Sequence, residues 1–159
     1  MNYRPIWHGD GGRYVLLRCS LTLTGPCRDG RLTCAASGPF QLYIDGMRVT
    51  GGPGGAATES PLWYPRDLTG NWDVGPHELV VVIDGGPGQS KPWFAMHGEL
   101  AAAASGTVAH TIESGLHWHA LELRRPPEGC PPEELPDERY SALEDPRLTG
   151  TPWEGVITI

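Results

Sequence analysis

The chain has 159 residues and a net charge of −7, and it contains 22 glycines and 16 prolines. This length corresponds to one domain, and the glycine and proline content disfavours helix because both residues are costly inside helices. The acidic balance argues against a nucleic-acid partner, since phosphate binding requires a basic patch. An acidic surface of this kind suits a neutral ligand or none.

The sequence contains neither a secretion signal nor a membrane span. Its first twelve residues, MNYRPIWHGDGG, include no apolar run of signal-peptide length. No segment approaches the roughly 20 apolar residues of a membrane-spanning helix. We therefore expect a cytoplasmic location and no membrane partner.

Alternating apolar residues predict strands in the first fifty residues. Residues 13–23 place five apolar side chains on one face: Val15, Leu17, Cys19, Leu21 and Leu23. Residues 31–37 and 40–45 continue the pattern, and six side chains are expected to face inward: Leu32, Cys34, Ala36, Phe40, Leu42 and Ile44. Cys19 and Cys34 are thus expected to be buried thiols. Asp45 and Gly46 predict a tight hairpin turn.

The middle of the chain mixes loop and strand signals. Residues 51–61 are expected to form a long polar loop, and residues 67–78, DLTGNWDVGPHE, a short turn or helical turn. Residues 78–84, ELVVVID, are apolar on both faces, which predicts a central strand covered on both sides.

The last third predicts more strands and a stiff connection. Strands are expected in 94–104, 106–114 and 116–125, with a helical alternative for GELAAAA at 98–104. The proline-rich residues 126–136 predict an extended linker, and one more strand-like run follows. About eight short strands, regularly punctuated, indicate a β-sandwich or barrel.

Four stretches, in this order, resemble the N-terminal domain of bacterial α-L-rhamnosidase-type glycoside hydrolases. Residues 5–23 carry an opening Trp, and residues 40–53 carry a Tyr-containing strand, an Asp-Gly turn and a Gly-Pro loop. Residues 63–83 carry an Asp-Leu-Thr segment before a central strand, and residues 138–159 carry a late Tyr and Trp. VGPHE before the central strand and HWH around Trp118 depart from the family pattern. The resemblance implies an all-β jelly-roll β-sandwich similar to galactose-binding domains.

The resemblance also implies a division of the chain and a role. Residues 1–125 are expected to form the sandwich, and residues 126–159 a linker and exit strand leading towards a following domain. In this family, hydrolysis takes place in a separate helical barrel with acidic residues as acid and base. The chain is therefore expected to be non-catalytic, an accessory domain that binds carbohydrate beside a catalytic domain in cis or in trans.

Two other functions compete with this one. A structural domain would pack on the catalytic barrel without binding sugar, and it predicts an exposed apolar patch that includes Trp7, Trp153 and residues 155–159. A small hydrolase in its own right would need a pocket whose carboxylates have perturbed pKa values. Asp45 and Asp67, the latter at the start of the predicted turn, are better explained by turn formation and capping.

Aromatic residues after the two glycine-rich loops are the candidates for sugar binding. Flat rings pack against the C–H faces of sugars, and a few polar groups bond the hydroxyls. The predicted carbohydrate-binding residues are Trp63, Tyr64, Arg66, Gln89, Trp93 and Phe94. The competing interpretation places these aromatics in the core, and it is favoured for Tyr64. The expected ligand is a neutral glycan containing rhamnose or a similar sugar.

Metal binding has weaker signals. His117 and His119 flank Trp118 and share one strand face, so with His97 or His110 they would make a metal site. An exposed polar face with Trp118 packed inward is the simpler interpretation. Modules of this type carry calcium by resemblance, but no acidic cluster supplies its oxygen ligands, and no cofactor is expected.

Overall fold

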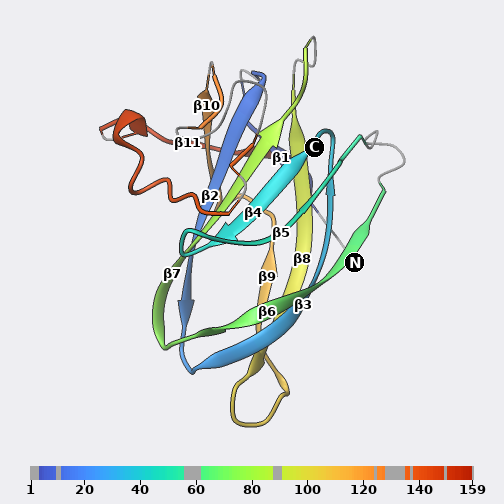
Figure 1. Ribbon diagram of the computed structural model, residues 1–159, viewed down its shortest axis with the longest axis vertical. Coiled ribbons are helices and arrows are strands. Elements are labelled where there is room, and N and C mark those ends of the chain that lie inside the picture. Colours follow the sequence, from blue (N-terminus) through green and yellow to red (C-terminus); the bar gives the residue numbers. More distant parts are fainter. Residues whose placement is uncertain are drawn as a thin grey trace.

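In the computed structural model, two antiparallel six-stranded sheets pack face to face (Figure 1). The structure describes residues 4–9, 12–55, 62–87, 91–123, 125–127, 135–136, 138–148 and 150–158. The predicted all-β sandwich is confirmed. The described part of the chain has one helical element, the short 3₁₀ turn η1 (Pro146–Leu148), and no helix there is long and apolar enough to span a membrane.

The two sheets interleave strands from all parts of the chain. Sheet A contains β1 (Ile6–Trp7), β3 (Cys27–Ala36), β6 (Tyr64–Trp72), β8 (Trp93–Ala102), β9 (Val108–Glu113) and β12 (Ile157–Thr158). Its order is β12-β1-β8-β3-β6, and β9 also pairs with β8. Sheet B contains β2 (Tyr14–Leu23), β4 (Phe40–Ile44), β5 (Met47–Gly52), β7 (Gly75–Asp84), β10 (His119–Leu123) and β11 (Glu154–Gly155). Its order is β11-β10-β2-β7-β4-β5.

The core between the sheets follows the alternation in the sequence. The inward residues predicted for β2, β3 and β4 all pack in it, Leu21 only in part. The predicted buried thiols are confirmed: burial raises the pKa of Cys19 to about 11 and that of Cys34 to about 12. Trp118 is fully buried, and its indole Nε1 donates a hydrogen bond to the Glu113 carbonyl at 3.0 Å.

Strand β7 is buried on both faces, as its sequence predicts. Leu79, Val81 and Ile83 enter the core between the sheets, whereas Val80 and Val82 point outward from sheet B. These outward valines belong to a second cluster, which we call the outer cluster. Its buried members are Leu16, Tyr43, Val80, Val82, Leu121, Tyr140, Ala142 and Leu148.

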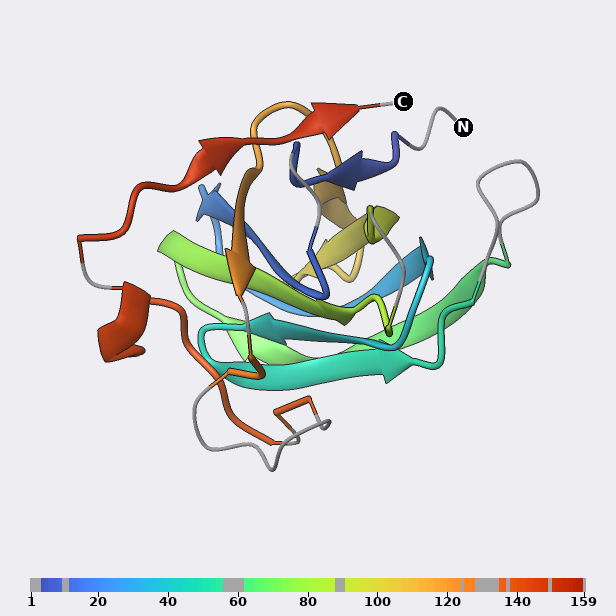
Figure 2. The ribbon, with the colours of Figure 1, turned by 90° about the horizontal axis from the view of Figure 1, so that it is seen from above.

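The C-terminal segment, residues 135–153, covers the outer cluster. Its Tyr140, Ala142 and Leu148 pack there, with Leu135 and Trp153 partly buried beside them. Backbone hydrogen bonds tie the segment to sheet B, and one joins the Tyr140 N–H to the Gly46 carbonyl at 2.9 Å. Figure 2 shows this segment, in orange to red, on the sheet B side of the sandwich. The division at residue 125 stays a prediction, and most of the expected linker lies outside the described residues.

Two local predictions are wrong. Residues 67–72 lie in β6 rather than in a turn, because Leu68 and Trp72 enter the core while β6 pairs with β3. Asp67 therefore sits mid-strand opposite Arg31 and caps nothing. The helical alternative for residues 98–104 also fails, since residues 98–102 are part of β8 and pair with β3 and with β9. In both places sheet pairing outweighs local propensity.

The Asp45-Gly46 turn has the predicted conformation and an additional electrostatic role. Asp45 and Gly46 have φ values of 52° and 80°, as a tight hairpin turn requires. The Asp45 carboxylate accepts the Glu78 N–H at 2.9 Å and lies 2.6 Å from Nδ1 of His77, whose Nε2 lies 2.7 Å from the Asp73 carbonyl. Only the imidazolium donates from both nitrogens. Burial lowers the pKa of His77, but these hydrogen bonds outweigh it and leave the pKa above its ordinary value.

His77→Gln should change how stability depends on pH. A raised folded-state pKa contributes stability that is complete below the unfolded pKa, about 6.5, and is lost as pH rises through the folded pKa. Urea unfolding at pH 5.5, 7 and 8.5 should therefore show the largest deficit of the variant at pH 5.5. The exposed His117→Gln variant should keep the wild-type profile, and a deficit of His77→Gln that grows with pH would contradict the assignment.

Candidate functional site

The two outer faces of the sandwich differ in what covers them. The C-terminal segment lies over sheet B and buries the outer cluster. Sheet A instead exposes polar side chains of β3, β6, β8 and β9. Arg31 and Asp67 are the extreme cases, with side chains 89% and 88% exposed. The outer face of sheet A is therefore free of the cover that the C-terminal segment gives to sheet B.

A cluster of tryptophans occupies one end of this face. Trp93 on β8 is buried, while Trp7 on β1 and Trp63, just before β6, are half-buried against it. Ala35 and Ala95, a register pair on β3 and β8, complete the group, which we call the tryptophan cluster. Small alanines let the indoles lie close to the sheet.

A cleft of about 540 Å³ occupies the other end of the same face. We call it the carboxylate cleft. It is lined by Asp29, Gly30, Arg31, Asp67, Leu68, Thr69, Glu99, Leu100, Ala101, Gly106 and Val108. Its volume lies in the range of small-ligand pockets. Carboxylates, a guanidinium and a hydroxyl thus converge beside a few apolar groups.

Strand register explains why these side chains meet. Arg31 on β3 pairs with Asp67 on β6 and with Glu99 on β8, so the three side chains form one row across the sheet. The Arg31 Nε lies 3.9 Å from an Asp67 carboxylate oxygen. At the next pair, a Cβ on Gly30 would lie 2.4 Å from the Glu99 carbonyl, so only glycine permits this approach of β3 to β8.

The structure divides the predicted sugar-binding residues between opposite faces. Trp63 and Trp93 belong to the tryptophan cluster, whereas Phe94 is fully buried in the core against Phe40, with ring centroids 5.3 Å apart. Successive strand residues point to opposite faces, so Trp93 and Phe94 cannot form one platform. Phe94 is ruled out as a sugar contact, and Trp93 is only 5% exposed.

Tyr64 and Arg66 lie apart from that cluster. Tyr64 is half-buried against the core, as the competing interpretation favoured, and its hydroxyl donates to the Gly54 carbonyl at 3.3 Å. The exposed Arg66 guanidinium lies 5.9 Å from the Tyr64 ring centroid, at the sheet edge. Gln89 lies outside the described residues. Trp63 and Arg66 stay predictions as ligand contacts.

Sequence reasoning missed the carboxylate cleft. Arg31, Asp67 and Glu99 lie far apart in the sequence; Arg31 and Glu99 have the appearance of ordinary exposed strand residues, and Asp67 that of a turn residue. Alternation identifies the outward face of each strand, but it does not say which strands are neighbours. Only the order β6-β3-β8 brings the three together.

The histidine hypothesis gains no support. His117 and His119 are exposed around the buried Trp118, as in the simpler interpretation. Across the ranges that the structure describes, no group of three or more His, Cys, Asp or Glu residues is placed to hold a metal ion.

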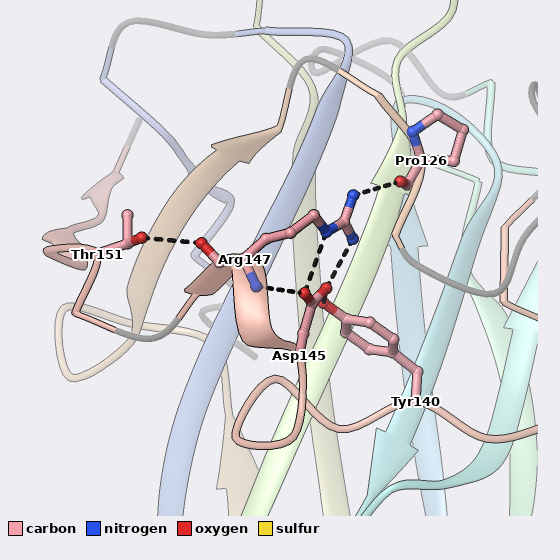
Figure 3. Close-up of polar contacts among 5 residues, drawn as sticks. All are labelled: Pro126, Tyr140, Asp145, Arg147 and Thr151. Atoms are coloured by element: carbon pink, nitrogen blue, oxygen red, sulfur yellow. Dashed lines mark hydrogen bonds and ion pairs between the residues drawn. The ribbon is translucent and has the colours of Figure 1, made fainter.

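A second polar group lies in the C-terminal segment and has a structural geometry (Figure 3). Arg147 donates to the Asp145 carboxylate from Nη2 at 2.6 Å, from Nε at 3.0 Å and from its backbone N–H at 2.9 Å, and the Tyr140 hydroxyl donates at 3.1 Å. Arg147 Nη1 also donates to the Pro126 carbonyl at 2.9 Å. The Asp145 side chain is only 3% exposed, so this group holds the segment together and offers no surface to a ligand.

No protein-family model matches this sequence, and no curated protein matches it by sequence. Its fold, however, is similar to parts of solved carbohydrate-active proteins. The Pleurotus ostreatus lectin in complex with GalNAc matches with a TM-score of 0.63 and 16% identity, over 98% of this chain and 42% of the lectin chain.

Two α-L-rhamnosidases are similar in the same way. The Streptomyces avermitilis enzyme complexed with L-rhamnose matches with a TM-score of 0.62 and 14% identity, over 99% of this chain and 15% of the enzyme. The Aspergillus terreus enzyme matches with a TM-score of 0.66 and 13% identity, over 99% of this chain and 21% of the enzyme. The chain thus spans less than half of each of these proteins. The resemblance to a rhamnosidase β-sandwich domain is confirmed for the fold.

Asp145→Asn should destabilise the protein by about 1–3 kcal/mol at pH 7, because the Arg147 donors lose their charged acceptor. Burial raises the pKa of Asp145, but its hydrogen bonds with Arg147 outweigh burial and leave the pKa below its ordinary value. The stability that ionised Asp145 contributes is present above the pKa of the unfolded chain, about 3.9, and is lost as pH falls through the pKa of Asp145 in the folded protein. Urea unfolding should show a deficit at pH 7 that shrinks towards pH 3. Asp67→Asn, on the exposed face, should stay within about 0.5 kcal/mol of wild type, and equal stability of both variants would contradict the assignment.

Trp93→Ala should cost about 3–5 kcal/mol, as truncation of a buried aromatic does. Trp63→Ala should cost less, about 1–2 kcal/mol, because Trp63 is half-buried. Urea midpoints of the two variants measure the difference. A smaller loss for Trp93→Ala than for Trp63→Ala would show that the cluster is packed differently. The expected order makes Trp63 the tryptophan suited to a binding test.

Proposed function

We propose that this chain is a non-catalytic module that binds a neutral carbohydrate on the outer face of sheet A. The observation that carries the proposal is the carboxylate cleft, where Arg31, Asp67 and Glu99 converge on an uncovered face. The same face carries the tryptophan cluster at its other end.

The chemistry of the cleft suits hydroxyl groups. A sugar hydroxyl both donates and accepts hydrogen bonds, and the cleft offers carboxylate acceptors beside a guanidinium donor and the Thr69 hydroxyl. Ala101 and Val108 add apolar surface for the C–H groups of a sugar ring.

The exposure of the carboxylates supports a non-catalytic role. A hydrolytic acid needs a sheltered environment that keeps it protonated. Asp29 and Asp67 have side chains 51% and 88% exposed, and Glu99 is exposed as well. Such groups suit hydrogen bonding better than acid catalysis.

The similar structures support the same class of ligand. One is a lectin in complex with GalNAc, and another is an α-L-rhamnosidase complexed with L-rhamnose. We extend to this chain a role beside a glycoside hydrolase, in cis or in trans. Rhamnose-like or GalNAc-like sugars are therefore the first ligands to test.

A second candidate is a structural domain that packs on a catalytic partner without binding sugar. It is favoured by Ile157, 48% exposed and paired with the half-buried Trp7 on the outer side of sheet A. Trp153, expected in the same patch, packs instead against the outer cluster of sheet B, and Val156 is buried. The apolar residues expected for this role are thus split between opposite sides.

Calorimetric titration with L-rhamnose, GalNAc, D-galactose and D-glucose at millimolar concentrations tests the proposal. We expect saturable heat with at least one sugar, and Glu99→Gln should weaken that binding by about tenfold, since a hydrogen bond to a charged group contributes about 1.5–3 kcal/mol.

The matched control is Glu144→Gln, another exposed glutamate, which lies on the C-terminal segment. It should bind as wild type does. Flat titrations with all four sugars would reject carbohydrate binding of this kind and favour the structural domain. Saturable binding unaffected by Glu99→Gln and by Arg31→Ala would place the site elsewhere.

A further inference from the structure

The carboxylate cleft continues towards the tryptophan cluster. A second hollow of about 360 Å³, lined by Arg31, Leu32, Pro65, Arg66 and Asp67, adjoins the cleft and shares two of its residues. Its other lining residues are Leu32, Pro65 and Arg66, and Pro65 on β6 lies two residues after Trp63. The two hollows therefore form a track along β6 that leads from Thr69 towards the tryptophans.

The length of this track exceeds one sugar ring. Trp63 and Thr69 are separated by six strand positions, and Trp93 and Glu99 on β8 by the same number. At about 3.3 Å per residue, each interval corresponds to roughly 20 Å. Alternate residues share a face, so the ends of both intervals lie on the outer side of sheet A.

Mostly small side chains lie between the tryptophan cluster and the carboxylate cleft on β3 and β8. The register pairs there are Ala35 with Ala95 and Thr33 with His97. The alanines are buried, and Thr33 and His97 are only partly exposed. Among the described residues on the outer side of β3 and β8, the partly exposed His97 is therefore the one ring between the tryptophan cluster and the cleft.

The track carries charges of both signs. Asp29, Asp67 and Glu99 line the hollows together with Arg31, and Arg66 lines the smaller hollow from the sheet edge. Acceptors and donors alternate over short distances, as in the Arg31–Asp67 pair at 3.9 Å. This pattern matches hydroxyl groups, and a polyanionic glycan would meet carboxylates at the cleft end of the track.

We propose that the ligand is a neutral oligosaccharide lying along the strands of sheet A, with one end in the carboxylate cleft and the other against Trp63. This rests on the proposed function and narrows its ligand from a sugar unit to a chain. Trp63 supplies the remote contact through its half-buried indole, and Pro65 and Asp67 line the intermediate part of the track.

The test is calorimetric titration with L-rhamnose and with its α-linked di-, tri- and tetrasaccharides, and with galactose and the matching β-linked galacto-oligosaccharides. In the series that binds, affinity should rise at least tenfold from monosaccharide to tetrasaccharide. Trp63→Ala should lower the tetrasaccharide-to-monosaccharide affinity ratio severalfold, because it removes the flat ring against which the remote end of the chain would pack. Trp63→Phe, which keeps a flat ring, should restore most of the gain.

Leu143→Ala, an exposed apolar residue on the C-terminal segment, is the control and should keep the wild-type ratio. Thermal melting of each variant verifies that it is folded. Equal affinity for every length would overturn the extended site while leaving the proposed function intact. Absence of binding by any length in either series would overturn both, and a length dependence insensitive to Trp63→Ala would overturn the assignment of the remote end.

Discussion

The burial of β7 on both faces is the constraint on which the rest of the sandwich depends. One face belongs to the core, and Val80 and Val82 on the other face need a second apolar cover. Burying two valines is worth about 3–6 kcal/mol, which is comparable with the whole stability of a typical domain. The C-terminal segment provides the cover, and Asp145 holds the segment in shape through Arg147. The ion pair of Asp145 and Arg147 thus stabilises the segment that buries the outer cluster.

This cover also decides where a ligand has room. Once the C-terminal segment lies on sheet B, the part of its outer side that carries the outer cluster is buried. Sheet A keeps its polar side chains exposed, and its strand order gathers Arg31, Asp67 and Glu99 into one row. The asymmetry between the sheets, rather than any single motif, directs attention to the cleft and the tryptophans beside it.

Local periodicity predicted the fold well and the site poorly. The inward residues of β2 to β4, the turn at Asp45 and the two-sided burial of β7 follow from alternation and turn chemistry, which act over a few residues. The prediction of a turn at residues 67–72 is wrong because Asp, Gly and Asn favour turns locally. Pairing with β3 and burial of Trp72, which depend on residues distant in the sequence, decide the structure there. Neighbouring aromatics were grouped by sequence, although alternation sends Trp93 and Phe94 to opposite faces. The row formed by Arg31, Asp67 and Glu99 can be predicted only when the order of the strands in sheet A is known.

Strands β11 and β12 have a consequence for folding. Each adds an edge to a different sheet, and β12 pairs with β1, near the other end of the described chain (Figure 2). Residues 154–158 leave the ribosome after every other described strand. Until then β1 lacks its neighbour β12, and β10 lacks its neighbour β11. Contacts between such distant residues slow folding, and unpaired edges invite association with other chains. The sandwich is therefore most exposed to association with other chains before residues 154–158 have paired.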